Sequence, residues 1–273
     1  MLENVLRTIR FLCTGQFRRV WNEVHVRLYR WTWACLWYFV MPFRRAGRTE
    51  PTGSFTRDSQ YPVAFSSPDH IAPKGTAVNN STNKKFILDM DARLRREFGE
   101  QATLRMMDLG CAGGQTIADF MTLCWRGVGL EGSDFSLKHR RANWAQLANK
   151  NLFTCDITKP YQVKLDGQPA KFHLITAWEV MEHIATPDLM QVLGNIRDHL
   201  EPGGYFIAST TETSDIHEGL ELHQTRWTNP EWRAFIARNF PDLEYVDVGL
   251  KIYQFVRYNF LHPSFLLYRR KEA

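Results

Sequence analysis

From residue 104 onward the chain alternates short apolar runs with stretches of helical periodicity, and this alternation limits the possible folds more than any other feature. Seven apolar runs are typical of strands: 104–109, 127–131, 151–155, 172–178, 205–210, 243–248 and 252–258. Helical patterns separate most of them, near 115–124, 136–149, 187–200 and 229–239. Strands joined through helices usually pair in parallel, because each crossover brings the chain back to run in the same direction. The pattern predicts an α/β fold with a mostly parallel, doubly wound sheet.

The sequence around this core divides into four predicted parts. Residues 1–43 are expected to form amphipathic and hydrophobic helices, and 44–85, rich in Pro, Gly, Ser and Asn, a linker or lid. Residues 86–260 hold the strand and helix pattern, and 261–273 are expected to be a basic C-terminal tail. A chain of 273 residues, 44% of them hydrophobic, can bury one sizeable core, so a second full domain is not expected.

The N-terminal part carries most of the positive charge. Residues 1–50 contain nine arginines against three glutamates, and the run 31–43 contains no charge. This run has 13 residues, whereas a spanning helix needs about 20, so we do not expect it to cross a bilayer. One interpretation is an anchor lying on a membrane, with Trp31, Trp33, Trp37 and Tyr38 at the headgroups and arginines on anionic lipid. The other is that the same apolar stripe packs on the main domain or on a second subunit.

The cysteines indicate the compartment. Five cysteines are scattered without a CxxC pair, which argues against a disulfide framework and against a thiolate zinc site. A reducing, cytoplasmic location is therefore expected, with peripheral association at the inner face of a membrane if the anchor interpretation holds. The sequence indicates no particular oligomeric state.

A glycine-rich turn follows the first predicted strand of the core. The segment Asp108-Leu-Gly110-Cys-Ala-Gly113-Gly114 leads into a helical stretch, and glycine there lets a ligand approach the backbone closely. Glu131 ends the second strand 23 residues after Asp108, where a carboxylate can accept hydrogen bonds from both hydroxyls of a ribose. Asp156, after the third strand, suits an adenine amino group, although capping a turn is nearly as common a role.

These segments, taken in order with Phe172-His-Leu-Ile-Thr-Ala-Trp-Glu179 and Leu200-Glu-Pro-Gly-Gly204, resemble the motifs of class I S-adenosylmethionine (SAM)-dependent methyltransferases. The resemblance covers roughly residues 86–258. It implies a three-layer, Rossmann-like, seven-stranded sheet with an antiparallel last strand and with SAM at the carboxyl ends of the first strands. It also implies a set of cofactor-binding residues: Asp108, Gly110, Ala112, Gly113, Glu131, Asp156 and Trp178. Ala112 departs from the pattern, because it replaces a glycine that is common in this loop.

A second group of functional residues follows the fourth predicted strand. The sequence Glu179-Val-Met-Glu182-His183 places two carboxylates and an imidazole on one helical turn, and His223 lies beyond the fifth strand, at the same sheet edge. Oxygen and nitrogen donors of this kind suit Mg²⁺, Mn²⁺ or Zn²⁺.

The Glu-x-x-Glu-His pattern followed by His-x-x-x-Trp-Thr resembles the metal-dependent 2′-O-methyltransferases of small RNAs. Its first half also resembles quinone-biosynthesis and sugar O-methyltransferases. The resemblance implies that Glu179, Glu182, His183 and His223 hold Mg²⁺ or Mn²⁺, with His183, His223 and Glu179 in catalytic roles. The alternative is a metal-free site, in which His183 is the best general base and His223 the next.

The favoured function at this point is O-methylation of a hydroxylated small molecule or glycan, such as a glycolipid precursor at a membrane surface. The alternatives are an RNA 2′-O-methyltransferase, a quinone or catechol O-methyltransferase, and a non-catalytic scaffold that keeps the fold. Nucleic acid is not favoured as a partner, because the core shows no RNA-binding module or basic stripe. A polar stretch that includes Asp69 and His70 could form a lid, but a plain connection is commoner, so its residues are left outside the predicted site.

Overall fold

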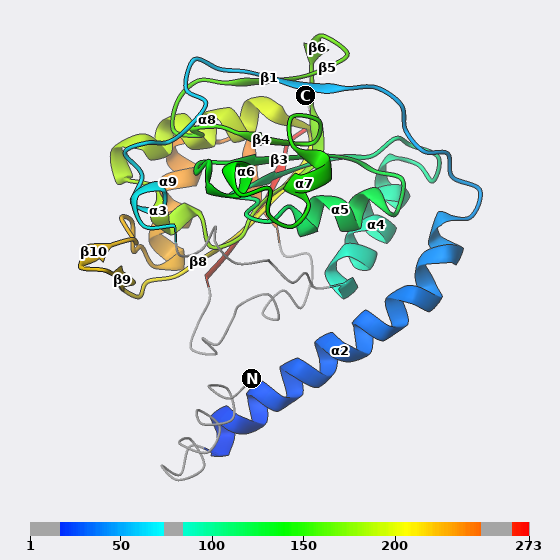
Figure 1. The fold of residues 1–273 in the computed structure, drawn as a ribbon, viewed down its shortest axis with the longest axis horizontal. Helices are drawn as coiled ribbons and strands as arrows, with labels where there is room; N and C mark the ends of the chain where they lie inside the picture. Colours follow the sequence, from blue (N-terminus) through cyan, green and yellow to red (C-terminus); the bar gives the residue numbers. More distant parts are fainter. Residues whose placement is uncertain (1–16, 74–83, 247–263, 273) are drawn as a thin grey trace.

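A seven-stranded sheet forms the centre of the molecule (Figure 1). The structure, a computed structural model, describes residues 17–73, 84–246 and 264–272. The strands of the sheet, in spatial order, are β11 (Leu243–Tyr245), β12 (Ser264–Arg270), β8 (Leu200–Thr210), β7 (Phe172–Ala177), β2 (Arg105–Leu109), β3 (Arg126–Glu131) and β4 (Leu152–Thr154). Strands β4, β3, β2, β7 and β8 pair in parallel, and β12 is antiparallel to both neighbours. The predicted doubly wound, mostly parallel sheet with an antiparallel last strand is confirmed, and this strand, β12, lies between β11 and β8.

The antiparallel strand β12 corrects one expectation. The predicted strand 252–258 lies outside the described residues, and β12 falls in the segment that we expected to be a basic tail. The arginines that suggested a tail bond the main chain of β8: Arg269 Nε donates to the Gly203 carbonyl at 3.1 Å, and Arg270 Nη1 to the Leu200 carbonyl at 2.5 Å. Basic residues next to a short apolar run therefore do not exclude a strand, because their guanidinium groups can bond the main-chain carbonyls of the neighbouring strand.

The helices follow the predicted pattern with one interruption. The helices α5 (Gln115–Met121), α8 (Leu189–His199) and α9 (Asn229–Asn239) lie where the periodicity placed them, and α4 (Lys84–Phe98) precedes β2. The pattern 136–149 instead forms two short helices, α6 (Phe135–Lys138) and α7 (Trp144–Leu147). Arg140 and Ala142 between them have φ angles of 47° and 43°, which an α-helix cannot contain.

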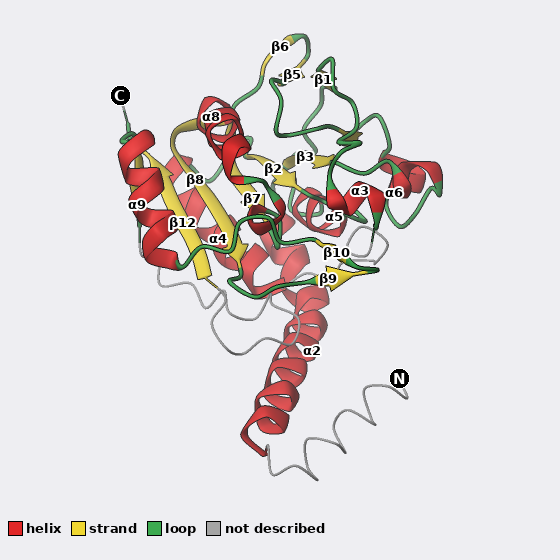
Figure 2. Ribbon diagram, turned by 90° about the vertical axis from the view of Figure 1, so that its left-hand side faces the viewer, coloured by secondary structure: helices red, strands yellow, loops and turns green. Residues whose placement is uncertain are grey.

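Side chains of the sheet alternate between two apolar layers. Met106 and Ile207 pack with α4 and α5 on one face, whereas their neighbours Met107 and Phe206 pack with α8 and α9 on the other. Successive side chains of a strand point to opposite faces, so a strand that is apolar throughout needs helices on both sides. The two clusters hold the sheet as the middle of three layers (Figure 2).

The region 44–85 is more ordered than a simple linker. It contains β1 (Phe55–Asp58), which pairs antiparallel with β5 (Gln162–Leu165). On its other side, β5 pairs antiparallel with β6 (Gln168–Pro169). The region also contains the short helix α3 (Pro68–Ile71). This region is therefore partly built into the domain.

The helix α2 (Phe17–Arg45) projects from the domain (Figure 2). One side packs on the layer of α4 and α5 through Trp37, which is buried, together with Trp33, Val40 and Met41. The predicted packing on the main domain thus holds for one face. Within the described part of the chain, no helix combines the length and apolarity that spanning a membrane would require.

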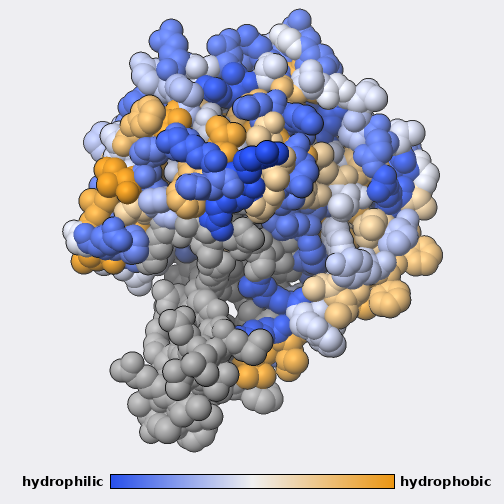
Figure 3. All heavy atoms as spheres, viewed as in Figure 1, coloured by the Kyte–Doolittle hydropathy of each residue, from blue (hydrophilic) through white to orange (hydrophobic). Residues whose placement is uncertain are grey.

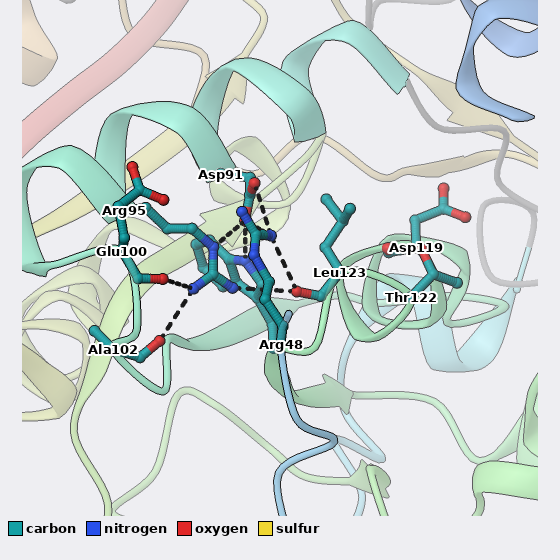
Figure 4. Close-up of polar contacts among 9 residues, drawn as sticks. Arg48, Asp91, Arg95, Glu100, Ala102, Asp119, Thr122 and Leu123 are labelled. Carbon is teal, nitrogen blue, oxygen red and sulfur yellow. Dashed lines mark hydrogen bonds and ion pairs between the residues drawn. The ribbon is translucent and has the colours of Figure 1, made fainter. Parts of the chain in front are cut away.

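A buried polar network joins the segment after α2 to the core (Figure 4). The Asp91 carboxylate on α4 accepts hydrogen bonds from Arg95 Nε at 2.8 Å, from Trp125 Nε1 at 2.8 Å and from Arg48 Nη1 at 3.1 Å. Arg95 also donates to main-chain carbonyls, including that of Leu123 at 3.1 Å. Asp91 and Arg95 are buried, so this network is a fixed attachment between α4, the start of β3 and the chain that leads from α2.

Candidate active site

The glycine-rich turn between β2 and α5 is shaped by left-handed backbone. Gly110, Ala112 and Gly114 have φ angles of 64°, 43° and 77°. A Cβ on Gly110 would overlap the Val180 side chain, and one on Gly114 would lie 2.5 Å from Leu152. Glycine at these two positions therefore lets the turn pass closely under its neighbours, which keeps its backbone at the carboxyl end of the sheet.

Neighbouring groups hold the turn in place. The Glu131 carboxylate at the end of β3 accepts from the Ala112 N–H at 2.8 Å. Trp144 Nε1 donates to the Ala112 carbonyl at 2.6 Å, and Asn143 N–H donates to the Gly113 carbonyl at 3.1 Å. The predicted cofactor residues of the turn thus lie beside Glu131, as a ligand spanning the ends of β2 and β3 requires.

Two buried carboxyls lie at this edge with raised pKa values. Burial raises the pKa of Glu131 to about 7, although the N–H groups of Ala112 and Ser133 donate to it. Burial likewise raises the pKa of Asp108 to about 7, against hydrogen bonds that include one from Thr176 Oγ1 at 2.6 Å. Donors of a bound ligand, such as ribose hydroxyls or an amine, would favour the ionised form of these two carboxyls and lower their pKa values.

Asp156 and Trp178 contact other groups. Asp156 follows β4, and its carboxylate accepts from the Thr158 N–H at 3.0 Å and from Thr158 Oγ1 at 2.6 Å, which is the turn-capping role considered above. The ring of Trp178 lies edge-on to Phe86 of α4 at 5.3 Å between centroids. Neither contact tests whether these residues reach the cofactor, so both stay predictions.

The four residues predicted to hold a metal do not all converge. Candidate ligand atoms of Glu182, His183 and His223 lie within 4.8 Å of one another. Glu182 and His183 lie on the 3₁₀ turn η1 (Met181–His183), and His223 follows the hairpin of β9 (Ile216–His217) and β10 (Leu220–Glu221). Glu179 is exposed, has a φ of 55°, and accepts a hydrogen bond from Ser209 Oγ at 2.6 Å. The structure thus groups three of the four and turns the fourth toward β8.

The three-residue group has the chemistry of a cation site. Both carboxylate oxygens of Glu182 are buried, and no described residue hydrogen-bonds to them. Burial, together with the nearby Glu179 carboxylate, raises the pKa of Glu182 to about 8. Burying an ionised carboxylate without a partner costs free energy. A divalent cation held by a Glu182 carboxylate oxygen and the two imidazoles would offset this cost. The donor set therefore fits Mg²⁺, Mn²⁺ or a softer divalent ion.

Neighbouring groups define which histidine nitrogens are available. His223 Nδ1 lies 2.5 Å from the Thr213 carbonyl, which can only accept, so this nitrogen carries the proton and Nε2 keeps a free electron pair. The rings of His183 and His223 meet edge to face with 4.7 Å between centroids. The Thr225 N–H donates to the Glu182 carbonyl at 2.9 Å and so ties the loop of His223 to η1. Sequence reasoning found the histidines but not these supports, because both supports lie in irregular loops.

One residue outside the predicted site also reaches it. Asp69 on α3 lies with its Oδ2 2.8 Å from His183 Nδ1. Burial alone lowers the pKa of His183, but Asp69 and the nearby Glu182 and Glu179 carboxylates raise it above its usual value. The polar stretch around Asp69 was the available signal in the sequence, and nothing local distinguished it from a plain connection.

Comparison with known proteins identifies the family of this chain. A family model described as a methyltransferase domain matches residues 80–248. The ubiquinone biosynthesis O-methyltransferase of Bradyrhizobium sp. (strain ORS 278) is 26% identical over 141 residues, which cover 49% of this chain and 53% of that protein. The chain thus matches about half the length of this curated relative.

Solved structures with a similar fold were also found. The 1,6-didemethyltoxoflavin-N1-methyltransferase of Burkholderia thailandensis, solved with S-adenosylhomocysteine, is 17% identical with a TM-score of 0.49, covering 75% of this chain and 84% of that one. The magnesium protoporphyrin IX methyltransferase of Synechocystis PCC 6803 is 12% identical with a TM-score of 0.47, covering 76% and 96%.

Proposed function

The chain belongs to the methyltransferase-domain family and is a class I SAM-dependent methyltransferase, and from that premise we propose that it methylates a hydroxyl oxygen of an acceptor with adjacent hydroxyl groups. A glycan or glycolipid precursor is the favoured acceptor. The observation that carries the proposal is the group of Glu182, His183 and His223 at the same sheet edge as the glycine-rich turn. Oxygen acceptors need such a group, because a neutral hydroxyl is a weak nucleophile until its proton is removed.

In the proposed reaction the residues of the chain position the two substrates. Asp108, Glu131 and the backbone of the turn hold the cofactor, so that its sulfonium methyl group faces the acceptor in line. The methyl group passes to the oxygen, leaving S-adenosylhomocysteine and one proton. If the site holds no metal, His183 or His223 accepts this proton, because each imidazole then has a ring nitrogen available for it.

A divalent cation fits the same residues. Glu182, His183 and His223 would hold it, with Mg²⁺ or Mn²⁺ favoured. When bound, the cation would lower the cost of deprotonating a hydroxyl that coordinates it. Glu179 stays part of the proposal as a fourth ligand, which requires its side chain to leave Ser209.

A catechol or quinol acceptor is the second candidate. The observation in its favour is the curated relative, named as a ubiquinone biosynthesis O-methyltransferase. Catechols share the adjacent hydroxyls of a sugar diol, so the same cation site would serve both. An RNA-terminal ribose has such a diol too, but the sequence of the core contains no RNA-binding module in its favour.

The test is methyl transfer from labelled SAM to a panel of glycans, catechols and short RNAs, with and without a chelator. We expect transfer to one hydroxyl-bearing class, loss of transfer with chelator, and recovery with Mg²⁺ or Mn²⁺. Glu182→Gln should remove metal dependence and most transfer, whereas Glu244→Gln, an exposed carboxylate on β11, should not. Chelator-insensitive transfer would overturn the metal and leave His183 as base. Transfer only to amines would overturn the oxygen acceptor.

We also propose that the outward face of α2 rests on the surface of an anionic membrane. Leu28, Trp31, Tyr38 and Phe39 on this face are 59%, 67%, 76% and 71% exposed, opposite the face that packs on the domain. Apolar side chains lie along the lower right of Figure 3, where Figure 1 places α2. Aromatic side chains beside arginines suit the headgroup region of a bilayer. Such a position would suit a lipid-linked acceptor at the inner face of a membrane.

Flotation with lipid vesicles tests this placement. The full chain should float with vesicles containing phosphatidylserine and less with neutral vesicles. Replacing Leu28 and Trp31 by Glu should abolish flotation, whereas Met190→Glu, which also changes an exposed apolar side chain, should leave it unchanged. Equal flotation of all variants would contradict the proposal, and a shift from dimer to monomer in the double variant would assign the face to a second copy instead.

A further inference from the structure

The segment 59–72 crosses the carboxyl end of the sheet, upstream of the region that the family model matches. The Asp156 N–H donates to the Tyr61 carbonyl at 3.0 Å, and the Ala64 N–H donates to the Gly132 carbonyl at 2.9 Å. These partners follow β4 and β3 directly. The family model matches residues 80–248, so this strap (residues 59–72) lies outside the matched region.

The strap ends in α3, which brings one carboxylate to the second half of the site. Asp69 Oδ2 lies 2.8 Å from His183 Nδ1, and the two side chains are 23% and 15% exposed. Pro68 is the first residue of α3, and the Ala72 N–H donates to the Pro68 carbonyl at 2.8 Å. This hydrogen bond spans the short helix that carries Asp69. Asp69 and His183 are 114 positions apart in the sequence, so this contact exists only in the tertiary structure.

We propose that Asp69 is a positioning residue for His183. A carboxylate can only accept at Nδ1, so the pair holds the His183 proton on Nδ1 and presents the electron pair of Nε2. His223 Nδ1 likewise lies 2.5 Å from an acceptor, the Thr213 carbonyl, so each of the two imidazoles has an acceptor oxygen beside its Nδ1. The inference deepens the proposed function, on which it rests, by naming the group that orients one of its imidazoles.

The effect of Asp69 should appear in turnover and not in cofactor binding. Removing a carboxylate that orients an imidazole ligand or base typically costs about 10- to 100-fold in metal affinity or activity. We expect Asp69→Asn to lower kcat within that range and to weaken Co²⁺ binding to a similar degree, with the KM for SAM within about twofold of wild type. Asp58 lies on the same N-terminal segment as Asp69, and its exposed carboxylate pairs with Lys164 of β5. Asp58→Asn should leave kcat, Co²⁺ binding and the KM for SAM unchanged.

Long-range proton–nitrogen NMR of the histidine rings tests the inference without turnover. At one fixed pH, the His183 signals, assigned by their loss in His183→Gln, should show a proton on Nδ1 in the wild type and a changed pattern in Asp69→Asn. A His183 proton on Nε2 alone, or identical spectra in the two proteins, would overturn the inference. A wild type that neither binds Co²⁺ nor methylates a hydroxyl would overturn the proposed function instead, while the NMR result would still decide the role of Asp69.

Discussion

The substitution Asp91→Asn should strongly destabilise the fold, because Asp91 is the only carboxylate in the network of Figure 4 that faces two guanidinium groups. It is fully buried, and Arg95 is 2% exposed. Asparagine keeps one acceptor oxygen, so some of the hydrogen bonds from Trp125, Arg95 and Arg48 survive. The charge does not survive, and Arg95 is left buried with only carbonyl partners.

The magnitude follows from this geometry. Removing one partner of a buried ion pair costs about 3–5 kcal/mol, and the retained acceptor places Asp91→Asn near the lower end, about 3 kcal/mol. Asp89→Asn is a matched control, two residues away on α4: its carboxylate is 35% exposed and pairs with Lys85, and such pairs contribute about 0–1 kcal/mol. Folded domains are stable by only about 5–15 kcal/mol, so the two variants should differ clearly.

Urea unfolding followed by tryptophan fluorescence and circular dichroism measures both variants. The unfolding midpoint of Asp91→Asn should fall well below that of wild type with an unchanged slope, and the midpoint of Asp89→Asn should stay close to wild type. If Asp91→Asn lost no more free energy of unfolding than Asp89→Asn, the ion pairs of the network would not stabilise the fold, and the reasoning would be refuted.

Three further predictions concern the sheet and its cofactor edge. Glu131→Gln should weaken SAM binding about 10- to 100-fold in calorimetry, because a charge-assisted hydrogen bond contributes about 1.5–3 kcal/mol; unchanged affinity would remove Glu131 from the cofactor site. Gly110→Ala should lower the thermal unfolding midpoint more than Gly167→Ala. Both glycines have positive φ, but only at Gly110 would the added Cβ overlap a side chain, that of Val180. Equal decreases in the midpoint would show that the overlap with Val180 is relieved at no cost in stability. Burial lowers the pKa of His173 from 6.5 to about 4. Between these two pH values His173 is protonated in the unfolded chain and neutral in the folded chain. Stability should therefore fall by about 2 kcal/mol more between pH 7 and pH 5 in wild type than in His173→Asn, and parallel pH profiles would contradict this.

Much of the fold was predictable from local patterns. Strand and helix periodicities repeat every two and every 3.6 residues, so a short window of sequence is enough to recognise them. The order of strands and helices then led to the parallel sheet, and the Asp108 to Gly114 segment with Glu131 located the cofactor edge. The pairing of Glu182 with His183 was predictable for the same reason, since the two are adjacent.

Other features depended on where distant segments meet. The sequence by itself determined the alternating α/β core, the glycine-rich turn and the residue types of the candidate cation site. Only the tertiary structure brought β12 into the sheet, turned Glu179 toward Ser209, placed Asp69 beside His183 and left one apolar face of α2 exposed. The reason is physical: periodicity and backbone preference act over a few residues, whereas these contacts join groups that only the folded path of the chain brings within a few ångströms.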